Sequence, residues 1–340
     1  MRMTISDIAK LANVSKSAVS IVLNNKTGVS KKTRSKVLET IKKYNYNPNH
    51  IAQSLAAKET KSIGLIIKEI DNPYFSKVMK GVYDTCSELG YSALLASSEL
   101  STDKESEIIS TLMSKRVDGL IISPLQIENT NFTHISNLIN EKFPLVVLDR
   151  ISNYLTNSVD IDNIQAAYDA VSYLIKLGHK NIAHFAGPAH SGHGQKRLEG
   201  YRQALIDNNL PINNDYILPV EPYTSNGYRA GKELFSKKIE LPTAVFCYND
   251  LVAIGIINAL LELGIKVPEV VSVVGFDNID FGEFLKIPLT TVNMPAYEIG
   301  KAATKLLIKQ IGNSSAPLNE KIVIEHELIE RQSSEKLIQV

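Results

Sequence analysis

The chain has 340 residues, of which 44% are hydrophobic and 21% charged, a composition typical of a globular protein of two or three domains. No run reaches the roughly 18 apolar residues of a membrane-spanning helix, and the start lacks the apolar core of a signal segment. We therefore expect a cytoplasmic protein with no membrane partner. Cys86 and Cys247 lie far apart in the sequence, which favours buried free thiols over a disulfide.

The charge is distributed unevenly along the chain. Residues 1–61 hold 12 basic and 3 acidic side chains, a local charge of +9, whereas residues 62–340 hold 25 basic and 33 acidic ones, a charge of −8. A basic segment of this kind can neutralise the phosphates of a DNA duplex and release its condensed counterions. A solvated basic face is the alternative that charge alone leaves open.

Three short helices are predicted in the basic segment. Thr4 offers capping chemistry to a first helix that ends near Asn13, Ser15 caps a second, and Ser30 caps a third that stops before Pro48. The apolar positions expected to form their shared core are Ile5, Ile8, Ala9, Leu11, Ala12, Ala18, Val19, Val22, Leu23, Val37, Leu38, Ile41 and Tyr44. This is the helix-turn-helix arrangement, which places its second helix in the major groove.

The second helix has an unusual outward face. If its apolar side chains point inward, Lys16, Ser17, Ser20 and Ile21 point outward, and an exposed isoleucine beside a lysine is odd on a solvated surface. In the major groove, Lys can donate to guanine, Ser can serve several bases and Ile can pack on a thymine methyl group, each contact discriminating by about 1–3 kcal/mol.

The third helix begins with cations. Lys31, Lys32 and Arg34 lie in its first turn, where the helix dipole disfavours positive charge. Contact with phosphate oxygens would explain their position. Exposed side chains that tolerate a small electrostatic cost are the alternative.

A short apolar helix is predicted at residues 49–57. A helix of this length is marginal in water, so we expect it to form only on contact with a partner. Leu55 is a candidate for an apolar wedge between base pairs in the minor groove. A plain linker helix that packs on the rest of the protein is the alternative.

The amino-terminal segment resembles the head of the lactose/galactose repressor (LacI/GalR) family of bacterial transcription regulators. The residues that carry the resemblance are Thr4-Ile5-Ser6-Asp7-Ile8-Ala9, Asn13-Val14-Ser15, Val19-Ser20, Leu23-Asn24, Thr33-Arg34, Tyr46-Asn47-Pro48-Asn49 and Ala52-Gln53-Ser54-Leu55. Two positions depart from the family pattern: Ala18 stands where Thr is usual, and Ile21 where Arg or His is common. The operator sequence therefore stays open.

The resemblance implies roles for individual residues of the head. Base reading is expected of Lys16, Ser17 and Ile21. Phosphate contacts are expected of Ser15, Asn24, Lys31, Thr33 and Arg34. A minor-groove hinge is expected of Ile51, Ala52, Gln53 and Leu55.

Beyond residue 61, short apolar runs alternate with amphipathic stretches. The runs are 63–67, 92–96, 120–122, 145–148, 182–185, 244–247 and 271–274, and the helices between them are 78–89, 105–113, 166–177, 197–206, 252–263 and 299–311. This alternation predicts parallel sheets covered on both faces, in two lobes that exchange strands. The family resemblance implies two lobes like those of periplasmic sugar-binding proteins.

The predicted organisation is a small all-α head followed by an α/β body. We expect the helix-turn-helix domain at residues 1–48, the hinge at 49–60, the effector-binding and dimerisation domain at 61–332, and a tail at 333–340. Nothing leucine-rich with heptad spacing follows Arg331, so the family's tetramerising tail is expected to be absent and a homodimer is predicted.

Polar residues follow several of the predicted strands, where ligands bind in open parallel sheets. Carboxylates, amides, a guanidinium and aromatic faces suit a polyhydroxylated ligand, although Asp and Asn after a strand are often only helix caps. The family resemblance places Asp149, Arg197, Asn249, Asp277, Ser191 and His193 at effector contacts. The full predicted effector set is Tyr74, Phe75, Ser123, Asp149, Arg150, Ser191, His193, Arg197, Tyr223, Asn249 and Asp277. Tyr223 is included because Pro222 stands where the family commonly has an aromatic residue, and the neighbouring Tyr223 can supply the ring.

Rival functions are less well supported by the sequence. Gly187, Gly192 and Gly194 lack the spacing of a dinucleotide loop, and no nucleophile elbow is present, so an enzyme and a cofactor are not expected. His184, His190 and His193 suggest a metal, but no Cys or carboxylate nearby completes a shell.

An exported sugar-binding protein would have no use for the basic head. An architectural DNA binder would lack a cleft that binds an effector. We therefore predict a dimeric repressor of carbohydrate-related genes that binds double-stranded DNA at a pseudo-palindromic operator and responds to a sugar-like effector. A nucleobase or a co-repressor protein is the alternative effector.

Overall fold

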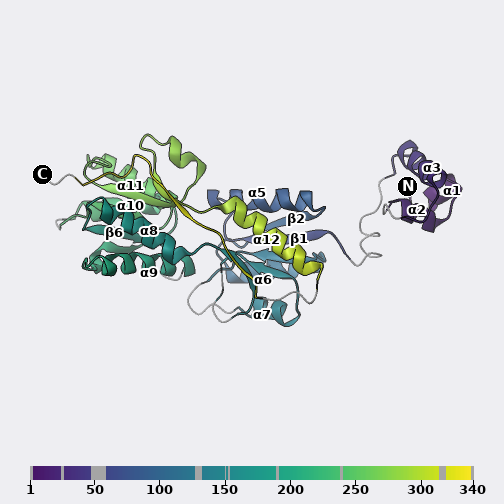
Figure 1. The fold of residues 1–340 in the computed structure, drawn as a ribbon, viewed down its shortest axis with the longest axis horizontal. Coiled ribbons are helices and arrows are strands. Elements are labelled where there is room, and N and C mark those ends of the chain that lie inside the picture. The colour runs from purple at the N-terminus through teal and green to yellow at the C-terminus, as the bar shows by residue number, and fades with distance from the viewer. Residues whose placement is uncertain are drawn as a thin grey trace. The chain divides into compact units, whose positions relative to one another are not determined.

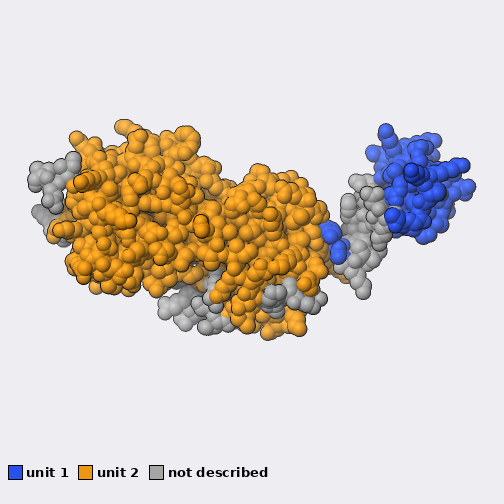
Figure 2. Space-filling model, in the orientation of Figure 1, with its two compact units in different colours: residues 1–61 blue, residues 62–340 orange. Residues whose placement is uncertain are grey.

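The computed structural model describes residues 3–23, 27–46, 59–126, 132–149, 151, 154–188, 191–237, 240–313 and 319–337. The chain divides into two compact units, residues 1–61 and 62–340 (Figure 2). Within the described ranges, no helix combines the length and the apolar character that crossing a bilayer requires.

The described residues of the first unit form three helices, α1 (Ile5–Leu11), α2 (Lys16–Leu23) and α3 (Lys31–Lys43). Thr4 and Asp7 form a capping box: the Asp7 amide donates to Thr4 Oγ1 over 3.3 Å, and the Thr4 amide donates to Asp7 Oδ2 over 2.9 Å. Ser15 and Ser30 accept hydrogen bonds at the starts of α2 and α3, each over 3.1 Å. The predicted caps are therefore confirmed.

The core of this unit differs in part from the prediction. Leu11, Leu38 and Tyr44 are 48%, 50% and 41% exposed rather than buried. Successive helical residues are turned by about 100°, so Leu38 points away from the core side that Val37 occupies. Tyr46 takes the place expected of Tyr44, because its amide donates to the Ile41 carbonyl and turns the chain back onto the core.

The described part of the second unit forms two six-stranded sheets, one in each lobe. The first sheet has the order β11-β5-β4-β3-β1-β2 and the second β12-β10-β9-β8-β6-β7. Every neighbouring pair is parallel except β10 with β12. The strands are β1 (Ser62–Ile67), β2 (Ser92–Ser97), β3 (Gly119–Ile122), β4 (Leu145–Val147), β5 (Asn157–Asp160), β6 (Ile182–Ala186), β7 (Ile217–Pro219), β8 (Ala244–Cys247), β9 (Ser272–Asp277), β10 (Thr290–Asn293), β11 (Lys321–Val323) and β12 (Glu327–Ile329).

Helices cover both sheets. They are α5 (Pro73–Glu88), α6 (Thr102–Ser114), α7 (Thr133–Asn140), α8 (Asn163–Lys176), α9 (Gly192–Asp207), α10 (Thr224–Phe235), α11 (Asp250–Glu262) and α12 (Ala296–Ile311), with 3-10 turns η1 (Asn214–Tyr216) and η2 (Asp280–Phe284). Helix α5 packs on α12 in the first lobe, and α8 on α9 and α10 on α11 in the second (Figure 1). The predicted α/β fold class is confirmed.

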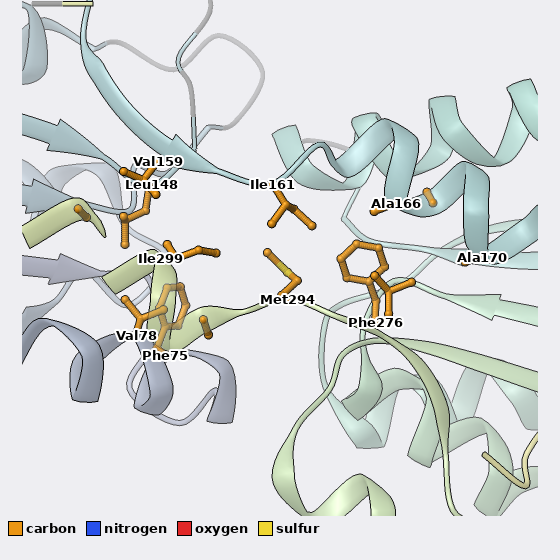
Figure 3. Packing of buried hydrophobic residues seen from close by; sticks show 14 of the residues in the cluster. Phe75, Val78, Leu148, Val159, Ile161, Ala166, Ala170, Phe276, Met294 and Ile299 are labelled. Atoms are coloured by element: carbon orange, nitrogen blue, oxygen red, sulfur yellow. The ribbon is translucent and has the colours of Figure 1, made fainter. Parts of the chain in front are cut away.

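The chain passes between the lobes three times. It leaves the first sheet after β5, returns after β10 to form α12, and crosses again between β11 and β12. Buried apolar side chains join the lobes at these crossings. Figure 3 shows Met294 between Ile299 of the first lobe on one side and Phe276 of the second lobe on the other, with Ile161 close by. The two lobes are therefore joined by a continuous apolar core.

Candidate functional site

The outward face of α2 carries the predicted base-reading residues. Lys16 and Ser17 are exposed, whereas Ile21 is half-buried rather than exposed. Ile21 lies beside the turn that follows α2: a Cβ built at Gly28 would be 3.8 Å from Ile21 Cδ1. Asn13 adopts a φ of +50° in the turn between α1 and α2, a conformation that asparagine tolerates better than most residues.

Of the other described head residues, Ser15 and Thr33 make hydrogen-bonding contacts at helix starts, and Lys31 and Arg34 carry positive charge on α3. Ser15 Oγ caps α2 and lies 2.8 Å from Ser17 Oγ, and Thr33 Oγ1 lies 2.9 Å from the capping Ser30 Oγ. Lys31 is exposed in the first turn of α3, which holds no acidic residue. Arg34 is half-buried. The predictions for Asn24, Ile51, Ala52, Gln53, Leu55 and Arg150 lie outside the described residues.

A cavity of about 120 Å³ lies between the two lobes, at the carboxyl ends of strands from both sheets. It receives eight of the predicted effector residues: Tyr74, Phe75, Ser123, Ser191, His193, Arg197, Asn249 and Asp277. Asp149 is fully buried and does not line it, and Tyr223 lies outside it and donates a hydrogen bond to Glu69 across the lobes. Lining residues that the sequence did not single out include Lys68, Gln126, Asp160, Tyr248 and Met294.

Arg197 holds several elements together at this cavity. Its Nε donates to Asn163 Oδ1 over 3.1 Å, one terminal nitrogen donates to the Tyr248 carbonyl, and the other lies 3.4 Å from Met294 Sδ. The guanidinium carbon lies 3.6 Å from the centroid of the Phe276 ring, a cation–π contact. Asn163 follows the crossing after β5, and Met294 lies at the crossing after β10. Arg197 therefore connects α9 to two of the segments that cross between the lobes.

Two aspartates occupy equivalent places in the two sheets. Asp149 lies two residues beyond the end of β4, and Asp277 is the last residue of β9. Their φ angles are +112° and +111°. Such angles are strained for residues other than glycine and occur at functional sites. Burial raises the pKa of Asp277 to about 8, although Arg197, 3.8 Å away, opposes this.

Charged groups from both lobes meet beside the cavity. Lys196 Nζ lies 2.7 Å from Asp149 Oδ1 and 3.8 Å from Asp160 Oδ2. His193 Nε2 lies 3.0 Å from Asp149 Oδ2, but the two atoms are not aligned for a hydrogen bond. Burial opposes ionisation of Asp160, yet His193 and Lys196 hold the pKa of its carboxyl below the usual value.

The same cluster contradicts the prediction that no carboxylate lies near His193. Asp149, Asp160 and His193 offer three ligand atoms within 4.8 Å of one another, so carboxylates do lie beside this histidine. The Lys196 ammonium group already supplies positive charge to Asp149. His184 is a core residue: it stacks on Phe246, Nδ1 lies 3.0 Å from the Phe246 carbonyl oxygen, and burial lowers its pKa to about 4.

Asn249 behaves as a helix cap, the alternative that its position after a strand suggested. Its Oδ1 accepts from the Val252 amide over 2.9 Å, and its Nδ2 donates to the Pro222 carbonyl over 3.0 Å. Both ends of the amide are therefore engaged within the protein. Asn249 shapes the cavity wall by fixing the start of α11 and the loop before α10.

Comparison with known proteins decides the family. The model of bacterial regulatory proteins, lacI family, matches residues 4–49, and the model of periplasmic binding proteins and sugar binding domain of the LacI family matches residues 60–332. The chain belongs to the LacI family. The predicted family is thus confirmed, and this LacI-family protein is a DNA-binding transcription regulator and not an enzyme.

Individual LacI-family relatives match almost the whole chain. The HTH-type transcriptional repressor PurR of Histophilus somni is 36% identical over 335 residues, which cover 98% of this chain and 99% of that protein. Catabolite control protein A of Priestia megaterium is 35% identical, with coverage of 98% and 100%. The solved lac repressor dimer bound to operator and the anti-inducer ONPF has 27% identity, a TM-score of 0.89 and coverage of 98% and 100%.

Proposed function

We propose that this LacI-family protein is a dimeric repressor whose operator affinity is set by a small polar effector in the cavity between the lobes. The observation that carries the proposal is that both lobes line one cavity beside an ion pair, Lys196 with Asp149, that itself spans the lobes. A ligand there contacts both lobes at once, so it can favour one lobe arrangement over another. Only such a differential affinity can shift the protein between two states.

For the head, we propose that Lys16 and Ser17 read base edges in a pseudo-palindromic operator, with Ile21 packing at the edge of that face. Exposure of Lys16 and Ser17 supports this assignment. Lys31 and Lys32, exposed at the start of α3, would contact phosphates. We also propose a cytoplasmic location, because a repressor of this kind acts on chromosomal DNA.

For the effector, we propose a sugar-like molecule, because the cavity combines polar groups with aromatic side chains such as Tyr74. A nucleobase is the second candidate. It is favoured by the similarity to PurR and by the Tyr74–Phe75 pair, whose rings lie 5.2 Å apart at the cavity. An aromatic base could stack there.

The proposal is tested with DNA fragments selected by the full-length protein from a genomic library. Lys16→Ala should weaken binding to a selected fragment about tenfold or more, with a much smaller effect on random duplexes. Lys32→Ala should weaken binding to both similarly and reduce the salt slope by about one. Equal losses on both DNAs for Lys16→Ala would refute the base-reading assignment. The effector role fails if no sugar, nucleobase or acidic derivative of either changes operator affinity.

A further inference from the structure

One lysine at the wall of the cavity has no counter-ion among the described residues. Lys68 directly follows β1, lines the cavity and is half-buried. Within the ranges that the structure describes, its ammonium group makes no hydrogen bond or ion pair. Burial lowers the pKa of Lys68, because the enclosed site solvates the charged form less well than water does.

The acidic groups near Lys68 are engaged elsewhere. Asp149 pairs with Lys196 over 2.7 Å, and Asp160 accepts a 2.8 Å hydrogen bond from the Ile161 amide and lies beside His193. Glu69 accepts the hydroxyl of Tyr223. Asp149 and Asp160 act on Lys68 only through space. Among the described residues, the positive charge therefore has no direct partner.

Other donors lie on the same wall. Ser123 follows β3, the parallel neighbour of β1, and its amide donates to the Ile66 carbonyl over 2.8 Å. This register brings Ser123 and Lys68 to adjacent strand ends, and both line the cavity. Helix α5 also starts there, at the Asn72 cap, with no acidic residue in its first turn. Helix N-termini carry partial positive charge.

We propose that Lys68 binds an acidic group of the effector, a phosphate or a carboxylate, so that the effector is an acidic small molecule rather than a neutral sugar or base. This inference rests on the proposed effector role of the cavity. An ammonium group has three donors and no acceptor, and its hydrogen bonds to an anion are stronger than those to a neutral hydroxyl. A neutral ligand would cover Lys68 and leave its charge uncompensated.

The test compares neutral compounds with their acidic derivatives by calorimetry on the full-length protein. One series is galactose, galacturonate and galactose 6-phosphate; the other is guanosine and guanosine 5′-monophosphate; inorganic phosphate is added alone. We expect at least one acidic compound to bind at least ten times more tightly than its neutral parent. Comparison of galacturonate with galactose 6-phosphate identifies whether Lys68 prefers a carboxylate or a phosphate. Lys68→Met should remove that advantage and leave binding of the parent unchanged.

Two controls separate binding from folding. Lys80→Met removes the same charge from the exposed side of α5, where Lys80 pairs with Asp84, and should leave all affinities unchanged. Ligand-free Lys68→Met should melt at the same temperature as the original protein or higher, because it removes a partly buried charge without a partner. A lower melting temperature would indicate a structural role for Lys68 and count against the inference.

The outcomes distinguish this inference from the proposed function. Equal affinities for neutral and acidic compounds would overturn the role of Lys68 while leaving the cavity as the effector site. The same holds if an acidic compound binds preferentially but equally well to Lys68→Met. If no compound of either kind binds while operator binding persists, both the inference and the proposed effector site fail.

Discussion

Lys196 Nζ of the second lobe lies 2.7 Å from Asp149 Oδ1 of the first lobe, so an ion pair spans the cleft. Asp149 is fully buried, whereas the Lys196 side chain is 32% exposed. A carboxylate in such a place needs a cation, because removal from water strongly disfavours its charge. The pair therefore links the two lobes directly beside the cavity.

Replacing Lys196 should destabilise the protein. Among the described residues, Lys196→Met leaves the buried Asp149 with only His193 as a charged contact, and we expect the free energy of unfolding to fall by about 1–3 kcal/mol, discounted for the partial exposure of Lys196. Urea denaturation measures the loss. Lys309→Met is the matched control, because Lys309 and Glu320 form a pair of the same 2.7 Å length with 58% and 33% exposure. Its loss should stay below about 1 kcal/mol, and equal losses would contradict the prediction.

Asp277 should make stability depend on pH. In the unfolded chain its carboxyl ionises near the ordinary value of 3.8, whereas in the folded protein burial keeps it protonated up to about pH 8. Its contribution to stability is therefore complete below about pH 4 and is lost as the pH rises towards 8. Unfolding measured at pH 5 and pH 8 should show a larger decrease for the original protein than for Asp277→Asn, by roughly 1–4 kcal/mol.

Two observations control the Asp277 experiment. Asp250, whose pKa burial raises to about 7, produces a change of the same sign, so a residual slope in Asp277→Asn is expected. Asp207→Asn, at an exposed position near the end of α9, should leave the slope of the original protein intact. An identical slope in the original protein and in Asp277→Asn would show that Asp277 is ionised in the fold.

The contact between α5 and α12 should not tolerate a methyl group. A Cβ built at Gly300 would lie 2.2 Å from the Val78 carbonyl oxygen, and backbone cannot move aside as a flexible side chain can. We expect Gly300→Ala to cost roughly 1–3 kcal/mol, measured by thermal or urea unfolding. Gly312→Ala, whose Cβ would have its nearest atom at 3.6 Å, should change stability by less than about 0.5 kcal/mol. Equal stability of both variants would show that α5 and α12 do not approach each other this closely at Gly300.

Much of the architecture could be read from local sequence. Thr4, Ser15 and Ser30 cap the helices that were expected to follow them, and the apolar runs at 63–67 and 244–247 are central strands. Caps and buried strands depend on residues within a few positions of one another, so their signal is local. Strand β5 (Asn157–Asp160) and strand β10 (Thr290–Asn293) were missed, because their polar side chains hide the apolar pattern.

The charge network of the cleft depended on the tertiary structure alone. Nothing near Lys68 in the sequence shows that its ammonium group lacks a partner among the described residues, and nothing near Asp149 shows that Lys196 supplies one. The amino-acid sequence determined the family, the helical head, the alternation of strands and helices, and the chemical kinds of the cleft residues. Which charges meet was decided by three crossings between the lobes, because they bring together residues separated by dozens of positions, and the interaction of charges depends on distance in space.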